Sequence, residues 1–247
     1  MSARFEQILG IRFFIGSAEQ AVERTKSSGG LMVAPSGPGL RKLAINQIYR
    51  QALLNADLVI ADSAYMVLLW NLTQFRWIQK LSGLKYLRAL LRTDEFRARN
   101  AVLWVMPRTD SAEKNRIWLR SIGIEVEDRL IYIAPFYEEN IEDEILLALI
   151  EKQRPRHVVI CIGGDIQEPL GSYLKQRLSY LPSIHCIGAA IGFLSGDQVG
   201  IPVWADHLAL GWLWRIFSRP RIYFPRYWEA RSLAGLIMSY RDQSPVA

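Results

Sequence analysis

The chain has 247 residues, of which 50% are hydrophobic and 22% charged, and this balance excludes a disordered or fibrous protein. The length suits one compact domain with a small addition. The formal net charge of +6 predicts an anionic partner, such as a nucleic acid, a phosphorylated substrate or an acidic lipid.

Three features predict a cytoplasmic protein. The start of the chain has no long apolar stretch after Arg4, as a signal peptide would. The apolar segment 58–72 is interrupted by Asp62 and is too short to cross a bilayer, so no transmembrane helix is expected. Cys161 and Cys186 lie in apolar runs without metal-ligand spacing, which indicates buried thiols in a reducing compartment.

Strands and helices alternate along most of the chain. A helix is predicted over 18–28, ending at Gly29 and Gly30. The predicted strands that follow span 31–34, 57–62, 101–106, 129–134, 157–164 and 185–190. The predicted helices between them span 41–56, 63–72, 111–122, 138–153 and 170–181. This alternation predicts an α/β fold, a Rossmann-like parallel sheet flanked by helices on both faces with right-handed crossovers.

The character of the sequence changes near residue 203. Beyond it, arginines alternate with tryptophans, tyrosines and phenylalanines, so we expect an α/β core over 1–202 and a basic, aromatic, helical appendage over 203–247. Such a tail suits diphosphate groups or the headgroup region of a membrane with acidic lipids. Two alternatives remain: a core helix pair with solvated arginines, and a surface for single-stranded nucleic acid.

Two strand ends carry the candidate chemistry, because ligands of open parallel sheets bind beyond the carboxyl ends of the strands. Asp62 ends one predicted strand, where its carboxylate could take a proton from an attacking hydroxyl, although it could simply cap the next helix. Gln167 and Glu168 follow Gly163 and Gly164, where backbone amides could hold an anion; the alternative is a turn with a capping acid.

Other common sites are missing from the sequence. There is no G-x-G-x-x-G after the first strand and no Walker loop, which disfavours dinucleotide and P-loop binding. His157, His185 and His207 are isolated, and no Asp-x-Asp pair is present to hold a divalent ion against a nucleotide diphosphate. We therefore expect neither a metal nor an organic cofactor, with charge on a leaving group met by arginine and backbone amides.

At this point the order of motifs resembles the TagA/WecG/CpsF family of bacterial glycosyltransferases, nearly end to end. The most specific segment is LGWLWRIFSRPRIYFPRY at 210–227, which resembles the family's W-L-x-R-L…E-P-x-R…R-Y signature. The other matching segments are ILGIRF at 8–13, ADLVIADSAYMVLLW at 56–70, LSGLKYLRALL at 81–91, VVICIGGDIQEPL at 158–170 and IGAAIGFLSGDQVGIP at 187–202.

The resemblance implies an inverting transferase that uses a nucleotide-activated sugar, typically UDP-N-acetylmannosamine or a related uronic acid or hexose, and the missing Asp-x-Asp pair favours a metal-independent mechanism. The acceptor that it implies is a sugar on undecaprenyl diphosphate at the inner face of the cell membrane, in the biosynthesis of a teichoic acid, capsule or exopolysaccharide. A peripheral membrane location follows, without nucleic acid as a partner. The resemblance is compatible with self-association but fixes no number of subunits.

The resemblance also implies roles for single residues. Asp62 occupies the position of the proposed catalytic base, and Gly163, Gln167 and Glu168 correspond to the family's G-x-P-K-Q-E motif. The implied diphosphate-binding residues are Arg215, Arg221 and Arg226.

Several motifs depart from the family pattern. Ser36 stands where the family has the asparagine of T-x-N, and Tyr137 ends a Pro-Phe-Tyr sequence in place of the donor-site motif G-Y-F. Because lost polar partners change which substrate a site accepts, these changes concern the sugar more than the chemistry. Two alternatives therefore stay open: a catalytically degenerate member that binds nucleotide sugar or lipid-linked glycan, and a nucleic-acid-binding α/β protein.

Overall fold

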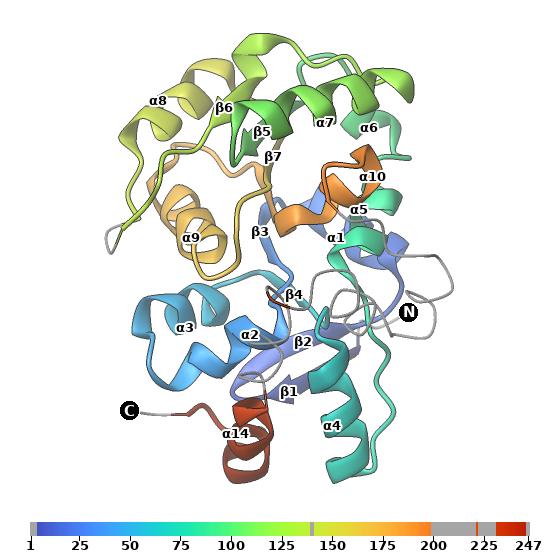
Figure 1. The fold of residues 1–247 in the computed structure, drawn as a ribbon, viewed down its shortest axis with the longest axis vertical. Coiled ribbons are helices and arrows are strands. Elements are labelled where there is room, and N and C mark those ends of the chain that lie inside the picture. Colours follow the sequence, from blue (N-terminus) through green and yellow to red (C-terminus); the bar gives the residue numbers. More distant parts are fainter. Residues whose placement is uncertain (1–3, 139–140, 199–220, 222–230, 246–247) are drawn as a thin grey trace.

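One eight-stranded sheet forms the centre of the computed structural model, which describes residues 4–138, 141–198, 221 and 231–245 (Figure 1). The spatial order is β1-β2-β4-β3-β8-β7-β5-β6, and only the β1–β2 pair is antiparallel. The α/β class with a mostly parallel sheet is thus confirmed. The strands are β1 (Arg4–Ile8), β2 (Ile11–Ile15), β3 (Gly30–Val33), β4 (Leu58–Ile60), β5 (Val102–Met106), β6 (Ile131–Ile133), β7 (His157–Ile160) and β8 (Ser183–Cys186).

Helices cover both faces of this sheet. Figure 1 shows α3, α8 and α9 along one side and α1, α5 and α7 along the other. The described helices are α1 (Ala18–Ser28), α2 (Gly37–Leu40), α3 (Gln47–Leu54), α4 (Ala64–Gln74), α5 (Gly83–Leu90), α6 (Asp94–Arg97), α7 (Thr109–Ser121), α8 (Glu144–Gln153), α9 (Gln167–Arg177), α10 (Gly192–Ser195) and α14 (Ser232–Tyr240), with short 3₁₀ turns η1 (Arg41–Ala44), η2 (Asp128–Leu130) and η3 (Gly188–Ala190).

The central strands are apolar because both of their faces are covered. Every residue of β3, β4, β5, β7 and β8 is buried, as expected for parallel strands between two helical layers. At the sheet edges, β1 and β6 keep exposed or half-buried positions. The predicted strands at 31–34, 57–62, 101–106, 129–134 and 157–164 all correspond to observed strands.

Several predicted boundaries were wrong: the predicted helix 170–181 is α9 at Gln167–Arg177, the predicted strand 157–164 ends at Ile160, and three others differ for local reasons. The predicted strand 185–190 ends at Cys186, because Gly188 has a positive φ and starts η3. The predicted helix 41–56 divides into η1 and α3, since the Asn46 side chain caps α3 by accepting from the amide of Tyr49. The predicted helix 138–153 begins at Glu144, where Asp143 is the cap.

The N-terminal hairpin was not predicted. Leu9 and Gly10 connect β1 and β2, and both have positive φ, which fits a tight hairpin turn although leucine rarely adopts that conformation. The amides of Leu9 and Gly10 donate to the carbonyl oxygens of Arg241 and Asp242 at 2.7 and 2.9 Å. The C-terminal residues therefore hold a turn that the local sequence does not specify.

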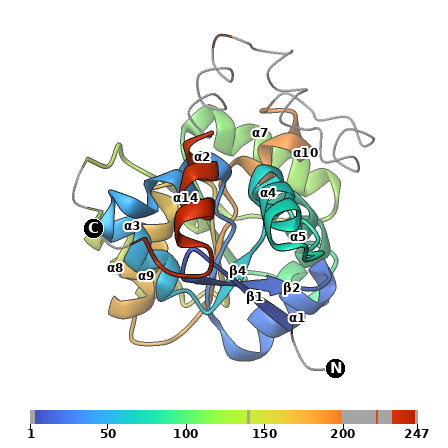
Figure 2. The same cartoon turned by 90° about the horizontal axis from the view of Figure 1, so that it is seen from below.

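The last described helix packs on the body of the protein. Leu233 and Ile237 of α14 are fully buried, and the helix contacts α4, α2 and η1. Figure 2, which views the molecule from below, shows α14 between α3 and α4. The predicted boundary between residues 202 and 203 lies outside the described residues.

Candidate active site

The loops that follow the strands form the carboxyl edge of the sheet, and the strand register aligns three predicted site residues there. Val33 pairs with Val59 and with Cys186, which in turn pairs with Ile160. Ser36, Asp62 and Gly163 each lie three residues beyond one of these aligned positions. The parallel register thus brings the ends of β3, β4 and β7 to one level at one edge of the sheet.

Asp62 lies at the start of two helices without capping the one that follows it. Ser63 caps α4, since its Oγ accepts from the amide of Met66 at 3.2 Å. Asp62 instead accepts, through Oδ1, a hydrogen bond at 3.2 Å from the amide of Gly83, the first residue of α5. Its side chain is half-buried. The carboxylate is therefore held at a helix N-terminus, where a negative charge is stabilised, in a partly accessible position.

Close approaches at glycines bring the neighbouring loops together. A Cβ built on Gly83 would lie 3.5 Å from both the Ala34 Cβ and the Ile187 carbonyl oxygen, so α5 starts over the ends of β3 and β8. A Cβ on Gly37 would lie only 2.9 Å from the Ser63 Oγ. The loops after β3, β4 and β8 are thus in contact around the Asp62 position.

Gln167 and Glu168 link the loops after β7 and β8. The Gln167 Oε1 accepts from the amide of Gly188 at 2.7 Å, and the Gln167 Nε2 donates to the Glu168 Oε1 at 3.2 Å. The Glu168 Oε2 accepts from the amide of Asp165 at 2.9 Å. Both side chains are buried. This pair fixes two peptide loops at the carboxyl edge, a larger role than the predicted alternative of a capping acid.

Burial raises the pKa of Glu168 to about 7, because the interior disfavours its charged form. The hydroxyl of Tyr49 is also buried, and within the described part of the chain it has no hydrogen-bond partner. A Cβ built on Gly39 would lie 2.6 Å from that hydroxyl and 3.0 Å from the Asp165 Oδ1. The Tyr49 hydroxyl of α3 and the Asp165 carboxylate after β7 therefore both lie close to Gly39 of α2.

Two residues at this edge had no predicted role. Lys42 of η1 forms an ion pair with Asp165 at 2.6 Å, and both side chains remain partly exposed. Gly83 supplies the amide that holds Asp62. Gly83 stood in a recognised motif, but only the tertiary structure shows which side chain its amide contacts. Lys42 carried no signal beyond its charge in a predicted helix.

The remaining predicted residues have different surroundings. Ser36 and Gly163 are exposed at the carboxyl edge, and a Cβ on Gly163 would meet nothing within 4 Å. Tyr137 lies after the edge strand β6, and its hydroxyl donates to Asp143 at 2.6 Å. In the sheet order, four strands separate β6 from β4, the strand that precedes Asp62.

Two of the predicted arginines, Arg215 and Arg226, lie outside the described residues. The third, Arg221, is exposed.

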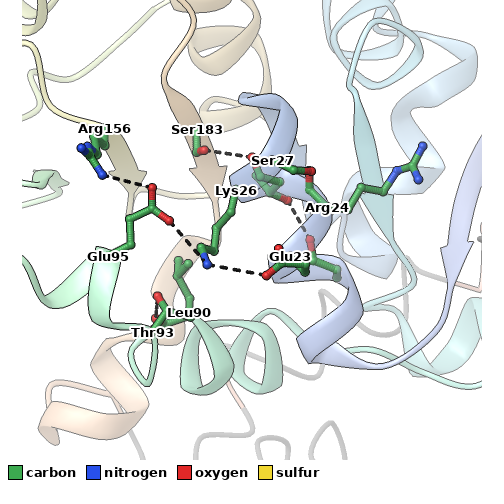
Figure 3. Close-up of polar contacts among 11 residues, drawn as sticks. Glu23, Arg24, Lys26, Ser27, Leu90, Thr93, Glu95, Arg156 and Ser183 are labelled. Atoms are coloured by element: carbon green, nitrogen blue, oxygen red, sulfur yellow. Dashed lines mark hydrogen bonds and ion pairs between the residues drawn. The ribbon is translucent and has the colours of Figure 1, made fainter.

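The amino edge of the same sheet carries a second group of polar side chains, centred on an ion-pair cluster. Figure 3 shows Glu95 between Lys26 and Arg156. The Glu95 Oε2 lies 3.4 Å from the Lys26 Nζ, and the Glu95 Oε1 lies 3.3 Å from the Arg156 Nη1. They line a pocket of about 300 Å³ together with His157 and Ser183, the first residues of β7 and β8. This pocket lies at the opposite edge from Asp62, so we do not place the reaction there.

A buried chain of hydrogen bonds leads inward from that edge. The Tyr86 hydroxyl contacts the His185 Nδ1 at 2.9 Å, and the His185 Nε2 contacts the His157 Nδ1 at 3.1 Å. Burial lowers the pKa of His157 to about 4 and that of His185 well below its usual range. These two histidines, which look isolated in the sequence, contact each other and join β7, β8 and α5 as neutral rings.

A comparison with protein-family models identifies the family of the chain. The sequence model of the WecG/TagA/CpsF glycosyl transferase family matches residues 6–244. The chain belongs to this family. The resemblance inferred from the motifs is therefore confirmed, and the protein is a glycosyltransferase with a nucleotide-sugar donor and a glycan acceptor. The match extends from the N-terminal hairpin to the residues after α14.

A search of curated proteins finds no match for this glycosyltransferase. Within the described ranges, no group of three or more histidine, cysteine, aspartate or glutamate side chains is arranged to hold a metal ion. No helix of these ranges has both the length and the apolar character needed to span a bilayer.

Proposed function

We propose that the protein is an inverting, metal-independent transferase that moves a sugar from a UDP-sugar to a sugar on a polyprenyl diphosphate. The observation that supports this most directly is the position of Asp62. Its carboxylate is half-buried at the carboxyl edge, held by the amide of Gly83 and level with the glycine loop after β7. Family membership supplies the general reaction, and this position supplies a base.

In the proposed reaction Asp62 takes the proton of the acceptor hydroxyl. The hydroxyl oxygen then forms a bond to the anomeric carbon while the bond between that carbon and the diphosphate oxygen breaks, and the electron pair leaves with the nucleotide diphosphate. Attack from the face opposite the leaving group inverts the configuration. A positioned base of this kind contributes on the order of a hundredfold to ten-thousandfold in rate.

The leaving diphosphate requires positive or hydrogen-bonding groups near the donor. We assign the exposed backbone at Gly163 and the hydroxyl of Ser36 to the donor side, and Arg215, Arg221 and Arg226 to the diphosphates. Gln167 and Glu168 are buried and bonded to loop amides, so in this proposal they position the loops around the donor. Tyr137 remains a predicted donor contact, although its hydroxyl is bonded to Asp143.

Membrane attachment belongs to the same proposal. The acceptor is carried by a lipid, so the enzyme would work at the inner face of the membrane, with the segment from residue 203 onward as one anchor.

The test combines binding and turnover. In a thermal-shift screen across nucleotide sugars, only the true donor should raise the midpoint of unfolding of the protein. A ligand that binds selectively to the folded state stabilises that state. The selected donor should then release UDP when membrane lipid extract is added. Stabilisation without any UDP release would favour a degenerate binding protein. Stabilisation by oligonucleotides and by no nucleotide sugar would favour the nucleic-acid alternative.

A further inference from the structure

Helix α4 is largely apolar, although only part of it is covered. Met66, Val67 and Trp70 are buried against the body, whereas Leu68 and Leu72 on the other side are exposed. The helix AYMVLLWNLTQ contains no charged residue. Of the exposed residues of α4, Leu68 and Leu72 are apolar and Thr73 is polar, so its outer side carries fewer polar side chains than an ordinary surface helix does.

The residues after α4 extend this apolar surface. Phe75 is 90% exposed and has a φ of 50°, a conformation that bulky side chains rarely adopt. Trp77, two residues later, is 85% exposed. Phe75 is the left-handed C-cap residue of α4, a position where glycine or asparagine is usual, and it presents a bulky aromatic side chain to solvent there.

Neighbouring elements contribute further exposed apolar side chains. Helix α14 contacts both α4 and η1, and Figures 1 and 2 both show it between α3 and α4. Met238 of α14 is exposed, as are Ile45, which follows η1, and Ile48 of α3. We name the docking face as the exposed side chains Ile45, Ile48, Leu68, Leu72, Phe75, Trp77 and Met238.

The charges around the docking face are nearly all positive. The segments 41–50, 64–80 and 231–242 together contain seven arginines and lysines and one acid, Asp242. Outside these segments, Glu6 forms an ion pair with Arg76 at 3.3 Å and Asp165 pairs with Lys42 at 2.6 Å. An apolar surface with aromatic side chains and a basic surround fits the headgroup region of a membrane that contains acidic lipids.

We propose that the docking face binds the surface of a bilayer with acidic headgroups. A second copy of the chain is a poorer occupant, because a two-fold contact would bring the same basic surround against itself. The position of α4 also suggests a role for this contact in catalysis. That role rests on the proposed function. Asp62 lies two residues before α4, so a docked α4 would bring the proposed base toward the membrane surface, where a lipid-linked acceptor is presented.

The test uses the whole chain and vesicles of phosphatidylcholine with or without phosphatidylglycerol. The variant Leu72→Gln/Phe75→Asn/Trp77→Ser removes apolar area while asparagine tolerates the left-handed φ at position 75. A control, Ile117→Gln/Phe136→Ser/Ile145→Gln, removes exposed apolar residues from α7, the loop after β6 and α8, away from the docking face. Unchanged thermal unfolding and circular dichroism would establish that both variants fold.

We expect the partition of the parent onto phosphatidylglycerol vesicles to fall at least about tenfold in the docking-face variant and less than about twofold in the control. Parent-like binding by the variant would show that residues elsewhere provide the attachment. Equal binding of the parent to both vesicle types, or none to either, would overturn the assignment to acidic lipid. A parent dimer that the variant converts to a monomer would identify a second copy as the occupant.

Activity separates this inference from the proposed function. The docking-face variant should lose transfer to an acceptor in vesicles and keep transfer to a short-chain, water-soluble acceptor. If the parent transfers no sugar to either acceptor, the proposed function fails, while vesicle binding still tests the docking face.

Discussion

The carboxyl and amino edges of the sheet both carry networks of polar side chains, and the two networks bind mainly different kinds of partner. At the carboxyl edge they bind backbone amides: Asp62 holds Gly83, Gln167 holds Gly188 and Glu168 holds Asp165. At the amino edge they bind one another, as in the chain from Tyr86 to His157 and in the cluster around Glu95. The first arrangement fixes peptide loops where a substrate can bind, whereas the second joins elements of the fold.

The largest expected effect is the loss of turnover in Asp62→Asn, at the carboxyl end of β4. The same substitution at the amino end of this strand serves as the control. Asp62→Asn should lower turnover on the order of a hundredfold to ten-thousandfold, because the amide cannot accept the proton of the acceptor hydroxyl. Its carbonyl oxygen can still accept from Gly83, so the midpoint of thermal unfolding should stay close to that of the parent. Initial rates of UDP release measure the effect.

Asp57→Asn is the matched control at the amino end of β4. Asp57 accepts from the amide of Leu31 at 2.7 Å and pairs with Lys175 at 2.7 Å, so the substitution should change stability and leave turnover intact. Parent-like turnover of Asp62→Asn, or an equal loss in both variants, would remove the distinction between the two edges.

The next effect is a pH dependence of opposite sign at the two edges. The folded-state pKa of Glu168 is raised by burial from 4.5 to about 7, so its stabilising contribution is complete below about pH 4.5 and is lost as pH rises to 7. The folded-state pKa of His157 is lowered by burial from 6.5 to about 4, so its contribution is present above pH 6.5 and is lost as pH falls to 4. Each change amounts to about 3 kcal/mol at most.

Two variants separate these opposing contributions. Glu168→Gln should keep the stabilising contribution of the buried histidines, so that the free energy of unfolding falls on acidification. His157→Gln removes one histidine contribution but keeps those of His185 and Glu168, so its free energy of unfolding should fall less on acidification than that of Glu168→Gln. Denaturant unfolding at a series of pH values measures both, and identical pH profiles for the two variants would contradict the assignment of the two groups to opposite signs.

The sequence predicted the elements that define the edges better than the contacts within them. Apolar runs bounded by glycine and proline located the parallel strands, and Asp62 and Gly163 follow from where those strands end. The hairpin at Leu9 was missed because distant residues near Arg241 stabilise its turn. The partners of Asp62 and Gln167, Gly83 and Gly188, were equally inaccessible, because a hydrogen bond between segments 21 residues apart leaves no local pattern.

A smaller effect is expected where a side chain holds a loop without contacting the reacting atoms. Gln167→Ala leaves the amide of Gly188 without its acceptor and should lower the free energy of unfolding by about 1–3 kcal/mol. Turnover should fall as well, because the loop after β8 is no longer fixed. Gln176→Ala, near the other end of α9, removes the hydrogen bond that the exposed Gln176 side chain donates to Ser172 and should change both properties less than Gln167→Ala does. A stability loss with unchanged turnover would make Gln167 a purely structural residue.

The smallest effect is expected at the ion-pair cluster of the amino edge. Glu95→Gln breaks the contacts to Lys26 and Arg156, but all three side chains are partly exposed, so the free energy of unfolding should fall by no more than about 1 kcal/mol. The difference from the parent should shrink in high salt, since solvent-exposed pairs are screened. Turnover should equal that of the parent at every salt concentration. A tenfold loss of turnover in Glu95→Gln would mean that the amino edge influences the carboxyl edge through the sheet, and the two edges would then have to be treated as one coupled site.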